Sequence, residues 1–443
     1  MKRNLLLLIV SLLLAIFLTA CGSGSEEAAS DQNNEDNKDT EEVGGNEETV
    51  AGDVELDFWF IDPGVKQEIY MEAVARFEEK NPNVKVNALQ IPNDDYKQRM
   101  VVSMSGGNPP DVFHSWGGGW LKEFVESDQV LDLTNEDIDF DQYYDVALAN
   151  STYDDKVFGL PLGLSPFFFY YNKEIFADNG LEVPETYDDL LNAIDVLKAN
   201  NVIPIALANQ TKWPGAFYLM YLADRIGGSE VFESAYHRTG GGFDHEAYVQ
   251  AGEYIQELVE RGAFNPGFNG VPYDAGQGRQ LIYSGQAAMM LMTTGFLNNM
   301  RDEFPEFEER MGVFTFPGVT GGKGDPKMLN AGAAPVWSAT KSEHSKYAVE
   351  LIKELTSAET AQAYVDRSGA PVAIVGVESQ DPFVREAQQM IEEASSIVFP
   401  YDQTLPPVLG ELHKDTVQEL FGLTMTPEDA AKAMEEKAKE ILD

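Results

Sequence analysis

The stretch from Lys156 to Glu174, KVFGLPLGLSPFFFYYNKE, most constrains how this chain can fold. It opens with a turn at Gly159 and then runs through five successive aromatic residues, 167–171. A strand that is apolar at successive positions is buried on both faces, as in a parallel or mixed sheet covered by helices. The chain is too long for one hydrophobic core, so we interpret the stretch as a crossing between two domains. The alternative is one interior strand of a single large domain.

The first 20 residues have the pattern of a secretory signal. Two basic residues precede an apolar run from Leu5 to Leu18 that is broken only by Ser11, which is short for a membrane span of about 20 residues. The run ends in LTAC, which resembles the lipoprotein box of bacteria, where the cysteine is lipidated and becomes the mature N-terminus. The resemblance implies palmitate or a similar acyl anchor on Cys21 and attachment to the cell membrane. The alternative is a cleaved signal with an incidental cysteine.

Cys21 is the only cysteine of the chain, so no disulfide and no cysteine-rich metal site can form within it. Residues 21–52 are rich in Gly, Ser and Asn, and they contain ten acidic residues against the single Lys38. A segment with this composition cannot bury enough apolar surface to fold. We therefore expect a disordered acidic tether after the lipidated N-terminus.

The acidity belongs mostly to the folded body. Signal and tether carry net charges of +2 and −9, so most of the total of −43 lies on residues 53–443. This argues against nucleic acid or an anionic surface as a partner, and it would also suit a saline or alkaline habitat. A body of 391 residues exceeds the size at which one core stops growing, so two domains are expected.

Hydrophobic periodicity predicts a βαβαβ start for the body, typical of a doubly wound lobe. After the crossing the pattern of strands and helices continues with new residues, and nothing repeats at a fixed period. The expected strands are Leu56–Phe60, Val84–Ala88, Asp111–His114, Val202–Ala208 and Ala287–Met292, and the expected later helices lie around Phe217–Ile226, Tyr248–Arg261 and Gln277–Ser284. Thr186 with Asp189 has capping-box spacing, and Thr426 with Pro427 has the pattern of a helix start.

The GLPL of the opening stretch, followed by YYNKEIF, resembles the signature of the extracellular solute-binding proteins of ABC importers, in the carbohydrate-binding family that includes maltose-binding protein. Further similar stretches follow in the family's order from Val54 onward. They are RFEEKNPNVKV (76–86), SGGNPPDVFHSW (105–116), GLEVPETYDDLLNAIDVLKANNVIPIALA (180–208), SGQAAMMLMTTGF (284–296) and the region 331–355.

The resemblance implies an α/β, two-lobed, type II periplasmic-binding fold, in which each lobe is a mixed sheet flanked by helices. Residues 53–163 and 314–368 would form the first lobe, and residues 164–313 and 369–443 the second. The chain would return to the first lobe at Gly312–Phe316 and cross a third time at Asp366–Val375. Because the lobes close over a ligand by hinge motion, we expect the site between them.

In open α/β sheets, ligands bind beyond the carboxyl ends of the strands. Those positions hold several aromatic and hydrogen-bonding residues here: Trp59, Asp62, His114, Trp116, Trp213, Thr294 and Phe296. A sugar presents apolar C–H faces ringed by hydroxyls, so flat aromatic surfaces with a few polar groups suit it. The alternative for any one tryptophan is a plug in the core.

Matching this chain to the family position by position gives the same region. The first-lobe loops supply Trp59, Asp62, Asn93, His114 and Trp116, the crossing supplies Ser165, and the second lobe supplies Trp213 as a stacking aromatic. Phe296 stands where the family usually has Trp, which puts tight stacking of a pyranose there in doubt. Gly332, Arg367, Tyr401 and Asp402 complete the set carried over from the family.

Signals for catalysis, metal binding and cofactors are lacking in the sequence. The five histidines form no HExxH pair, no GxSxG elbow occurs, and the glycine-rich pieces TGGGFDH and TGGKGDP lack the GK[ST] of a phosphate loop. We expect a monomeric binding protein, without cofactor, that delivers a mono- or oligosaccharide to the permease of an ABC importer. The alternatives are another solute in the same fold (a polyamine, glycerol-phosphate or a peptide), and a surface glycosidase or adhesin.

Overall fold

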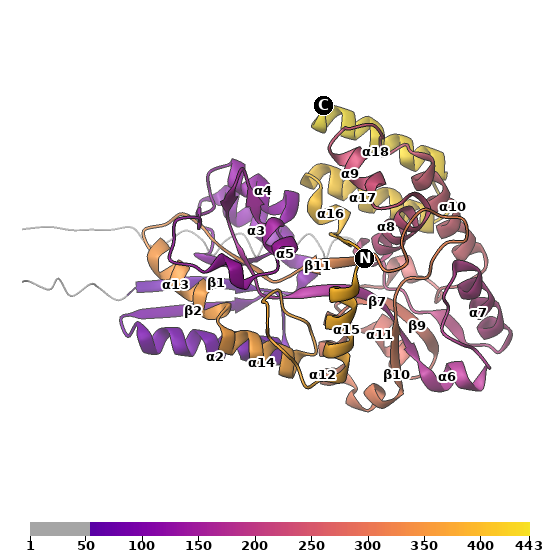
Figure 1. Ribbon diagram of the computed structural model, residues 1–443, viewed down its shortest axis with the longest axis horizontal. Coiled ribbons are helices and arrows are strands. Elements are labelled where there is room, and N and C mark those ends of the chain that lie inside the picture. Colours follow the sequence, from indigo (N-terminus) through magenta and orange to yellow (C-terminus); the bar gives the residue numbers. More distant parts are fainter. Residues whose placement is uncertain (1–53) are drawn as a thin grey trace, which may run out of the picture. The chain divides into compact units, whose positions relative to one another are not determined.

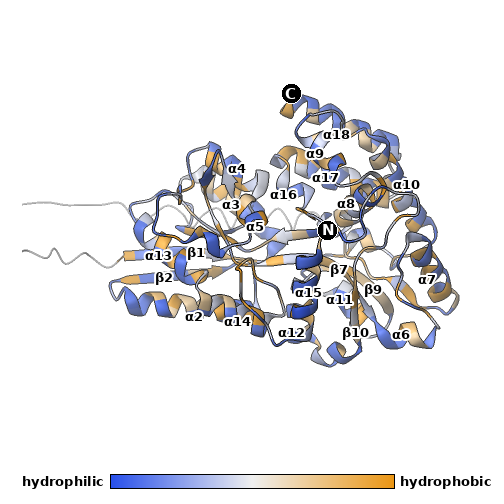
Figure 2. Cartoon of the chain, in the orientation of Figure 1, coloured by the Kyte–Doolittle hydropathy of each residue, from blue (hydrophilic) through white to orange (hydrophobic). Residues whose placement is uncertain are grey.

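The computed structural model describes residues 54–443, and the predicted signal, lipidated Cys21 and tether lie outside these residues. Two sheets, each covered by helices, organise the described part (Figure 1). The mixed α/β class predicted from the sequence is confirmed. The hydropathy colouring in Figure 2 shows helices such as α2 and α18 with both hydrophilic and hydrophobic residues along their length, as expected for helices packed on a core.

The first sheet has the strand order β2-β1-β3-β12-β6. Its strands are β1 (Val54–Phe60), β2 (Val84–Gln90), β3 (Val112–Ser115), β12 (Val336–Ala339) and β6 (Leu160–Pro161). Strand β1 pairs in parallel with both β2 and β3, and helices α2 (Gly64–Lys80) and α3 (Asn93–Gly106) connect these strands. The βαβαβ prediction is therefore confirmed. Helix α3 ends where Gly107 adopts a left-handed conformation, which glycine takes without strain.

The second sheet is centred on β7 (Leu164–Asn172), the aromatic strand from which the sequence analysis began. Strand β7 pairs antiparallel with β11 (Leu329–Ala333), β9 (Ala287–Thr293) and β10 (Met311–Phe314). Strands β13 (Ile397–Val398) and β8 (Ile203–Ile205) extend the sheet. The residues 167–170 are fully buried, because neighbouring strands and helices cover both faces of β7.

The first lobe, as we define it, consists of the first sheet and the helices that pack on it: α2, α3, α4 (Gly118–Glu126), α13 (Ser345–Leu355) and α14 (Ala358–Ser368). The second sheet with α8 (Trp213–Gly227), α10 (Glu246–Glu260), α11 (Gln277–Tyr283), α16 (Tyr401–Thr404), α17 (Pro407–Phe421) and α18 (Pro427–Leu442) is the second lobe. Further helices and strands are α5 (Asp145–Ala149), α6 (Lys173–Asp178), α7 (Tyr187–Ala199), α9 (Glu230–Tyr236), α12 (Gly295–Glu303), α15 (Pro382–Glu393), β4 (Thr152–Tyr153) and β5 (Lys156–Val157).

Three segments lie side by side at the hinge between the lobes, and their backbones bond to one another. Ala334 N donates to Gly163 O at 3.1 Å, and Leu164 N donates to Pro371 O at 3.1 Å. A Cβ on Gly163 would lie 3.0 Å from the carbonyl carbon of Ala334, so this close approach requires glycine. The crossings therefore form one thin hydrogen-bonded hinge between two larger cores.

The return crossing lies elsewhere than expected. Residues 311–314 form β10, which pairs with β7 inside the second sheet, and residues 329–333 form β11 of the same sheet. The aromatic ring of Phe314 stacks on Phe169 with 5.1 Å between the centroids, and this packing keeps the segment in the second lobe. The expectation of a crossing at Gly312–Phe316, and of residues 314–333 in the first lobe, is therefore wrong. The chain returns between Ala333 and Val336.

Two predicted helix starts are confirmed, whereas one strand is shorter than expected. The Thr186–Asp189 capping box begins α7, and Thr426 caps α18 with Pro427 in its first turn. Strand β8 ends at Ile205, although the sequence predicted a strand to Ala208. The reason is that Leu207 N bonds to the side chain of Asn265 at 2.7 Å and not to a neighbouring strand.

Candidate functional site

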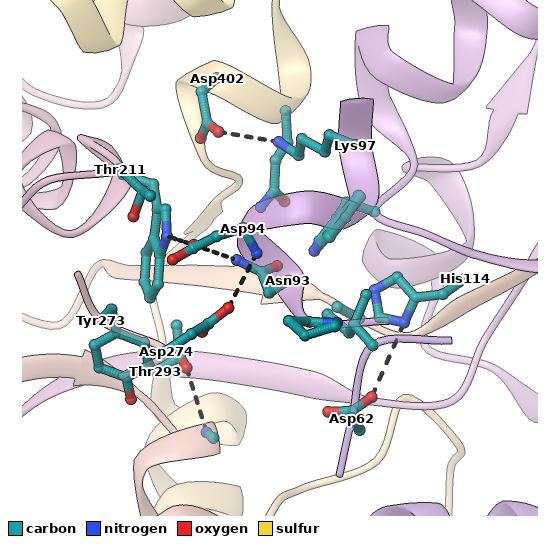
Figure 3. A pocket seen from close by; sticks show the side chains of 18 of the residues that line it. Asp62, Asn93, Asp94, Lys97, His114, Thr211, Tyr273, Asp274, Thr293 and Asp402 are labelled. Carbon is teal, nitrogen blue, oxygen red and sulfur yellow. Dashed lines mark hydrogen bonds and ion pairs between the residues drawn. The ribbon is translucent and has the colours of Figure 1, made fainter. Parts of the chain in front are cut away.

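A cavity of about 940 Å³ lies between the lobes. First-lobe loops line one wall, second-lobe helices and loops line the other, and the β7 and β11 crossings form the floor (Figure 3). Its volume is at the upper end of the range of pockets that bury small ligands. The site therefore has the place in the fold that the sequence analysis expected.

Asp62 lies two residues after β1, and His114 lies near the end of β3. Together they hold the first-lobe wall in place. Lys66 Nζ lies 3.4 Å from Asp62 Oδ1, Tyr70 donates to Asp62 Oδ2 at 3.0 Å, and His114 Nδ1 lies 3.9 Å from the same oxygen. Burial raises the pKa of Asp62, but the charge of Lys66 and the hydrogen bond from Tyr70 outweigh it and hold that pKa below its usual value. Burial lowers the pKa of His114 to about 4, so this imidazole is neutral near pH 7.

A row of aromatic rings in edge-to-face contact extends the first-lobe wall. His114 contacts Trp116 edge-on at 4.8 Å between centroids, Trp116 contacts Trp120 at 5.3 Å, and Trp120 contacts Phe124 at 5.0 Å. The order follows from the sequence, because Trp116 directly follows β3 while Trp120 and Phe124 lie on successive turns of α4. Trp116 and Trp120 are among the residues that line the cavity, although each is only 5% exposed.

The second-lobe wall is built around Trp213, the first residue of α8. Its ring meets Tyr273 edge-on at 5.0 Å, and its Nε1 donates to Asp94 Oδ1 at 3.4 Å. Asp94 N in turn donates to Asp274 Oδ2 at 3.0 Å. Burial and the nearby charge of Asp94 raise the pKa of Asp274. A first-lobe helix and the second-lobe wall therefore touch directly here.

A second contact between the lobes is made at α16. Lys97 Nζ of α3 lies 3.4 Å from Asp402 Oδ2, and Lys414 Nζ lies 3.9 Å from that oxygen. Burial raises the pKa of Asp402, but Lys97 and Lys414 together lower it, so the carboxylate is charged. The Lys97 ammonium also lies 4.8 Å from the ring centroid of Trp116, within the range of a cation–π contact.

Charged and neutral polar groups in the cavity differ in how they are satisfied. Within residues 54–443, the charged side chains that line it form ion pairs, with the exceptions of Asp94 and Asp274. Several neutral side chains are buried without a hydrogen-bond partner in the same part of the chain. The unpaired atoms are both ring nitrogens of His114, Thr211 Oγ1, Asn298 Oδ1 and Gln403 Oε1. These atoms lie at the cavity, so a ligand that enters it could bond to them.

The structure brings most of the predicted site residues together at the cavity. Those that line it are Asp62, Asn93, His114, Trp116, Ser165, Trp213, Gly332 and Asp402. Ser165 on β7 faces Gly332 on β11 in the sheet register. Its hydroxyl lies 2.6 Å from Thr294 Oγ1, so the floor is pinned to the start of α12.

Five predicted residues lie outside the lining. Thr294 is buried behind Ser165, and Phe296 is buried against Tyr170 at 4.5 Å, in the core where a ligand cannot stack on it. Trp59 packs under Arg99, whose guanidinium carbon lies 4.9 Å from the ring centroid. The remaining two, Arg367 and Tyr401, are held by Glu68 with Glu72 and by Asp224, respectively.

The sequence analysis missed several lining residues, including Trp120, Tyr273, Asn298 and Gln403. Trp120 carried a signal, since it stands four residues after Trp116 and could share its side of a helical turn. The other three had none, because loops and short helices far apart in the sequence bring them to the cavity.

Residues 54–443 contain neither a side-chain cluster for a metal ion nor a helix that could span a membrane. No cluster of His, Cys, Asp or Glu side chains there could hold a metal ion. No helix in that part of the chain is both long and apolar enough to cross a membrane.

Comparison with known proteins gives consistent matches. A family model described as bacterial extracellular solute-binding protein matches residues 63–362. A multiple sugar-binding protein of Streptococcus mutans is 26% identical over 320 residues, which cover 68% of this chain and 71% of that protein. A melibiose/raffinose/stachyose-binding protein of Bacillus subtilis is 20% identical over 384 residues, covering 85% of this chain and 87% of that protein.

A solved structure from work on xylan utilization by the thermophilic bacterium Caldanaerobius polysaccharolyticus superposes with a TM-score of 0.81 at 28% identity. It covers 87% of this chain, and all of that chain is matched. The shared fold therefore extends over nearly the whole of the part that the structure describes.

Proposed function

This chain belongs to the bacterial extracellular solute-binding proteins, and we propose that it captures a sugar or short oligosaccharide and delivers it to the permease of an ABC importer. The family acts outside the cytoplasm and consists of binding proteins. In this proposal, solute binds one wall of the cavity first. Contacts from the other wall then favour the closed state, which the permease recognises.

The observation that carries the proposal is the set of unpaired neutral groups in the cavity. His114, Thr211, Asn298 and Gln403 can accept or exchange hydrogen bonds with hydroxyl groups, while the lysines and most carboxylates are already paired with one another. An uncharged polyhydroxylated ligand would satisfy the first group without disturbing the second. The rings of Trp116 and Trp213 on opposite walls supply the apolar surfaces that the C–H faces of sugars need.

One observation favours a second candidate, a solute with a positively charged amine. Asp94 and Asp274 meet beside Trp213 and Tyr273 and form no ion pair among the described residues, although the charge of Arg279 acts on Asp274. Carboxylates next to aromatic rings suit an ammonium group. A polyamine or an amino sugar would use this corner, whereas a neutral sugar would use only its hydrogen-bond acceptors.

Two finer parts of the proposal concern anchoring and catalysis. We propose that Cys21 is lipidated and holds the protein at the outer side of the membrane, as the LTAC sequence suggests. Cys21→Ala would then move the protein from the membrane fraction to the soluble fraction, and unchanged retention would contradict the anchor. We also propose that the protein binds its solute as a monomer without chemically changing it.

A thermal-shift screen tests the main proposal. The panel contains melibiose, raffinose, stachyose and xylo-oligosaccharides, with spermidine, glucosamine and glycerol 3-phosphate as charged alternatives. A ligand at about 100 times its dissociation constant adds about 2.7 kcal/mol to the free energy of unfolding. We expect a shift with at least one neutral sugar. A shift with spermidine alone would instead support the second candidate, and release of a cleaved glycan product would contradict a pure binding role.

A further inference from the structure

Three successive glycines stand at the start of α4, Gly117 before it and Gly118 and Gly119 as its first two residues, and their surroundings differ. Gly117 has a φ of 67°, and a Cβ on it would lie 2.9 Å from the side-chain carbon Cγ of Asn150 in the same lobe. Gly118 N donates to Asn150 O at 2.7 Å, and Tyr153 donates to Gly118 O at 2.7 Å. The first lobe therefore holds this helix start rigidly from one side.

The other side of the helix start meets the second lobe. A Cβ on Gly118 would lie 2.8 Å from the carbonyl carbon of Gln403, and a Cβ on Gly119 would lie 2.6 Å from the carbonyl carbon of Leu405. Both neighbours are backbone atoms of α16 and of the residue that follows it, so they cannot turn aside as a flexible side chain could. Only glycine allows the two backbones to approach this closely.

Helix α16 is itself fixed to the second lobe. The buried ring of Tyr401 stacks on Phe232 with 4.0 Å between centroids, and its hydroxyl donates to Asp224 Oδ1 at 3.2 Å. The glycine pair and α16 are therefore two firm surfaces, one on each lobe. No chain crossing joins them, because two crossings lie at residues 162–164 and 333–336, and the third lies between Val384, which packs in the first-lobe core, and β13 of the second sheet.

The contact lacks the features of permanent packing. Gln403 Oε1 and Thr404 Oγ1 are buried there without a hydrogen-bond partner among residues 54–443. Such atoms also occur in the lobe cores, as at Trp337 Nε1, so they do not by themselves mark a contact that separates. Beside the glycine pair, the ion pair between Lys97 and Asp402 at 3.4 Å joins the lobes. Sparse polar pairing of this kind suits surfaces that separate and meet again.

We propose that the Gly118–Gly119 pair and α16 form the surface on which the two lobes meet when the cleft closes, and that Gly119 sets how long a bound sugar is retained. The inference rests on the proposed function. Gly119 acts through the position of the lobes and touches no ligand, so it is a positioning residue. Any side chain at this position would keep α4 away from α16 and leave a path by which the sugar escapes.

The test compares Gly119→Ala and Gly119→Val with Gly106→Ala. Gly119 is chosen over Gly118 because the φ of Gly118 is 58°, which would strain any side chain by itself. Gly106 is the matched control, since it lies at the end of α3 with nothing within 4 Å of an added Cβ. Raffinose is the first probe and xylobiose the second, with stopped-flow tryptophan fluorescence as the measurement of both rate constants.

We expect the dissociation rate constant to rise roughly tenfold in Gly119→Ala and further in Gly119→Val, with the association rate constant within about threefold of wild type. The melting temperature without sugar should stay within about 2 °C of Gly106→Ala. Small-angle scattering with saturating sugar should show a larger radius of gyration for Gly119→Val than for wild type.

Two results would overturn the inference while leaving the proposed function intact. The first is equal dissociation from all three variants and wild type. The second is a Gly119→Ala protein that does not fold or melts far below the control, because this would mean that α4 and α16 are packed together permanently. Failure of wild type to bind any sugar of the panel would instead overturn the proposed function, and this inference with it.

Discussion

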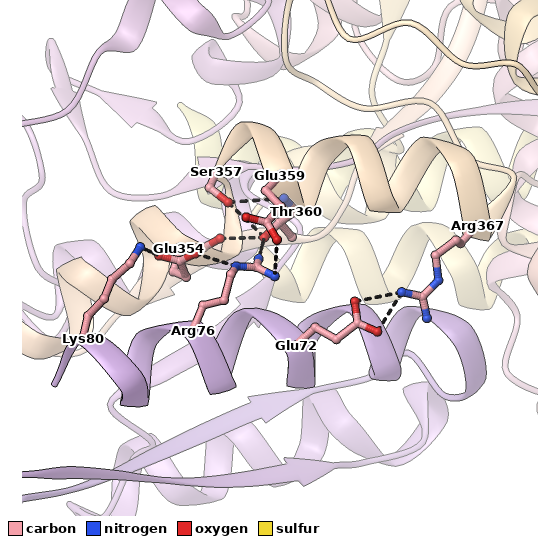
Figure 4. A network of polar contacts seen from close by, with 8 residues as sticks. All are labelled: Glu72, Arg76, Lys80, Glu354, Ser357, Glu359, Thr360 and Arg367. Atoms are coloured by element: carbon pink, nitrogen blue, oxygen red, sulfur yellow. Dashed lines mark hydrogen bonds and ion pairs between the residues drawn. The ribbon is translucent and has the colours of Figure 1, made fainter. Parts of the chain in front are cut away.

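Between α2 and the helices α13 and α14, outside the cavity lining, Arg76 donates to Glu354 at 2.8 Å and to Thr360 at 2.6 Å, and Lys80 completes the cluster (Figure 4). In the cavity, His114 and Asn298 are buried without partners for atoms that could make such bonds. Both regions are polar, but only the outer one is complete within the protein. This difference separates a structural network from a binding site better than charge content does.

The largest effect on ligand binding is expected at Trp213. Trp213→Ala should remove a central aromatic contact, which typically costs about 2 to 4 kcal/mol of binding free energy, or roughly 30-fold to 1000-fold in affinity. The melting temperature should change little, because the ring is only partly buried and faces the cavity. Calorimetric titration with the sugar found in the screen, together with a melting curve, provides the measurement.

Trp337 is the matched control, since it is fully buried in the first-lobe core against Phe58 and Tyr70. Trp337→Ala should lose about 3 to 5 kcal/mol of stability, with little effect on affinity in the protein that remains folded. If Trp213→Ala instead melted like Trp337→Ala and bound sugar normally, Trp213 would be a core residue and would leave the proposed site.

The unpaired imidazole of His114 should make the stability of the folded protein depend on pH. The pKa of this residue is about 4 in the folded protein, against about 6.5 in an unfolded chain. Between these values the unfolded state binds a proton that the folded state does not, so the free energy of unfolding falls as the pH drops from about 6.5 to 4. The difference between these two pKa values limits the loss in the free energy of unfolding to about 3 kcal/mol.

His114→Gln should flatten this part of the curve, measured by chemical denaturation at pH 7, 6, 5 and 4.5. The groups that face the imidazole are Asp62, Lys66 and Lys97, and all three remain in the variant. His413 also has a pKa lowered by burial to about 4, so part of the slope should persist. An unchanged slope would mean that His114 is not the neutral buried group described here.

A smaller effect is expected at Asn298. Its Oδ1 is buried without a partner, so Asn298→Leu should leave the free protein as stable as before or slightly more stable. Affinity for the sugar should fall by about 1 to 2 kcal/mol, since a ligand hydroxyl loses its acceptor. Reduced stability with unchanged affinity would contradict the assignment of this atom to the ligand. Titration and melting of the same preparation separate the two effects.

The sequence predicted the fold better than the site because fold signals are local. The aromatic run of β7 and the alternation in β1 report burial within a few residues of chain, and both strands lie where they were expected. The crossing at Gly312–Phe316 was misplaced because whether Phe314 packs on Phe169 depends on a strand about 140 residues away. Periodicity carries no such information.

The same limit explains the site residues. Tyr401 and Phe296 are aromatic residues near strand ends, and the sequence cannot distinguish a ring that faces a cavity from one that is buried behind it. Asn298 could not be found because its neighbours in α12 carry no pattern that marks it. Roles in ligand binding remain predictions for the whole set, including the residues that the structure places at the cavity.

The smallest effect is expected at Arg367, which the resemblance to the family placed in the site. The structure places it outside the cavity on α14, where it donates to Glu72 of α2 at 2.8 Å (Figure 4) and to Glu68 at 2.9 Å. These side chains are one-third to two-thirds exposed, so solvent screens the pairs and each contributes about 0 to 1 kcal/mol. Arg367→Ala should lower the melting temperature slightly and change affinity less than about twofold.

Ionic strength provides the control for this last prediction. The small loss should shrink in 1 M salt, because the Debye length falls to about 3 Å and exposed pairs are screened. Arg76→Met should keep more of its effect, since its partner Glu354 is only 10% exposed. If Arg367→Ala instead lost sugar binding as strongly as Trp213→Ala, the outer network would be coupled to the cavity. The separation between a completed structural network and an open binding site would then no longer hold.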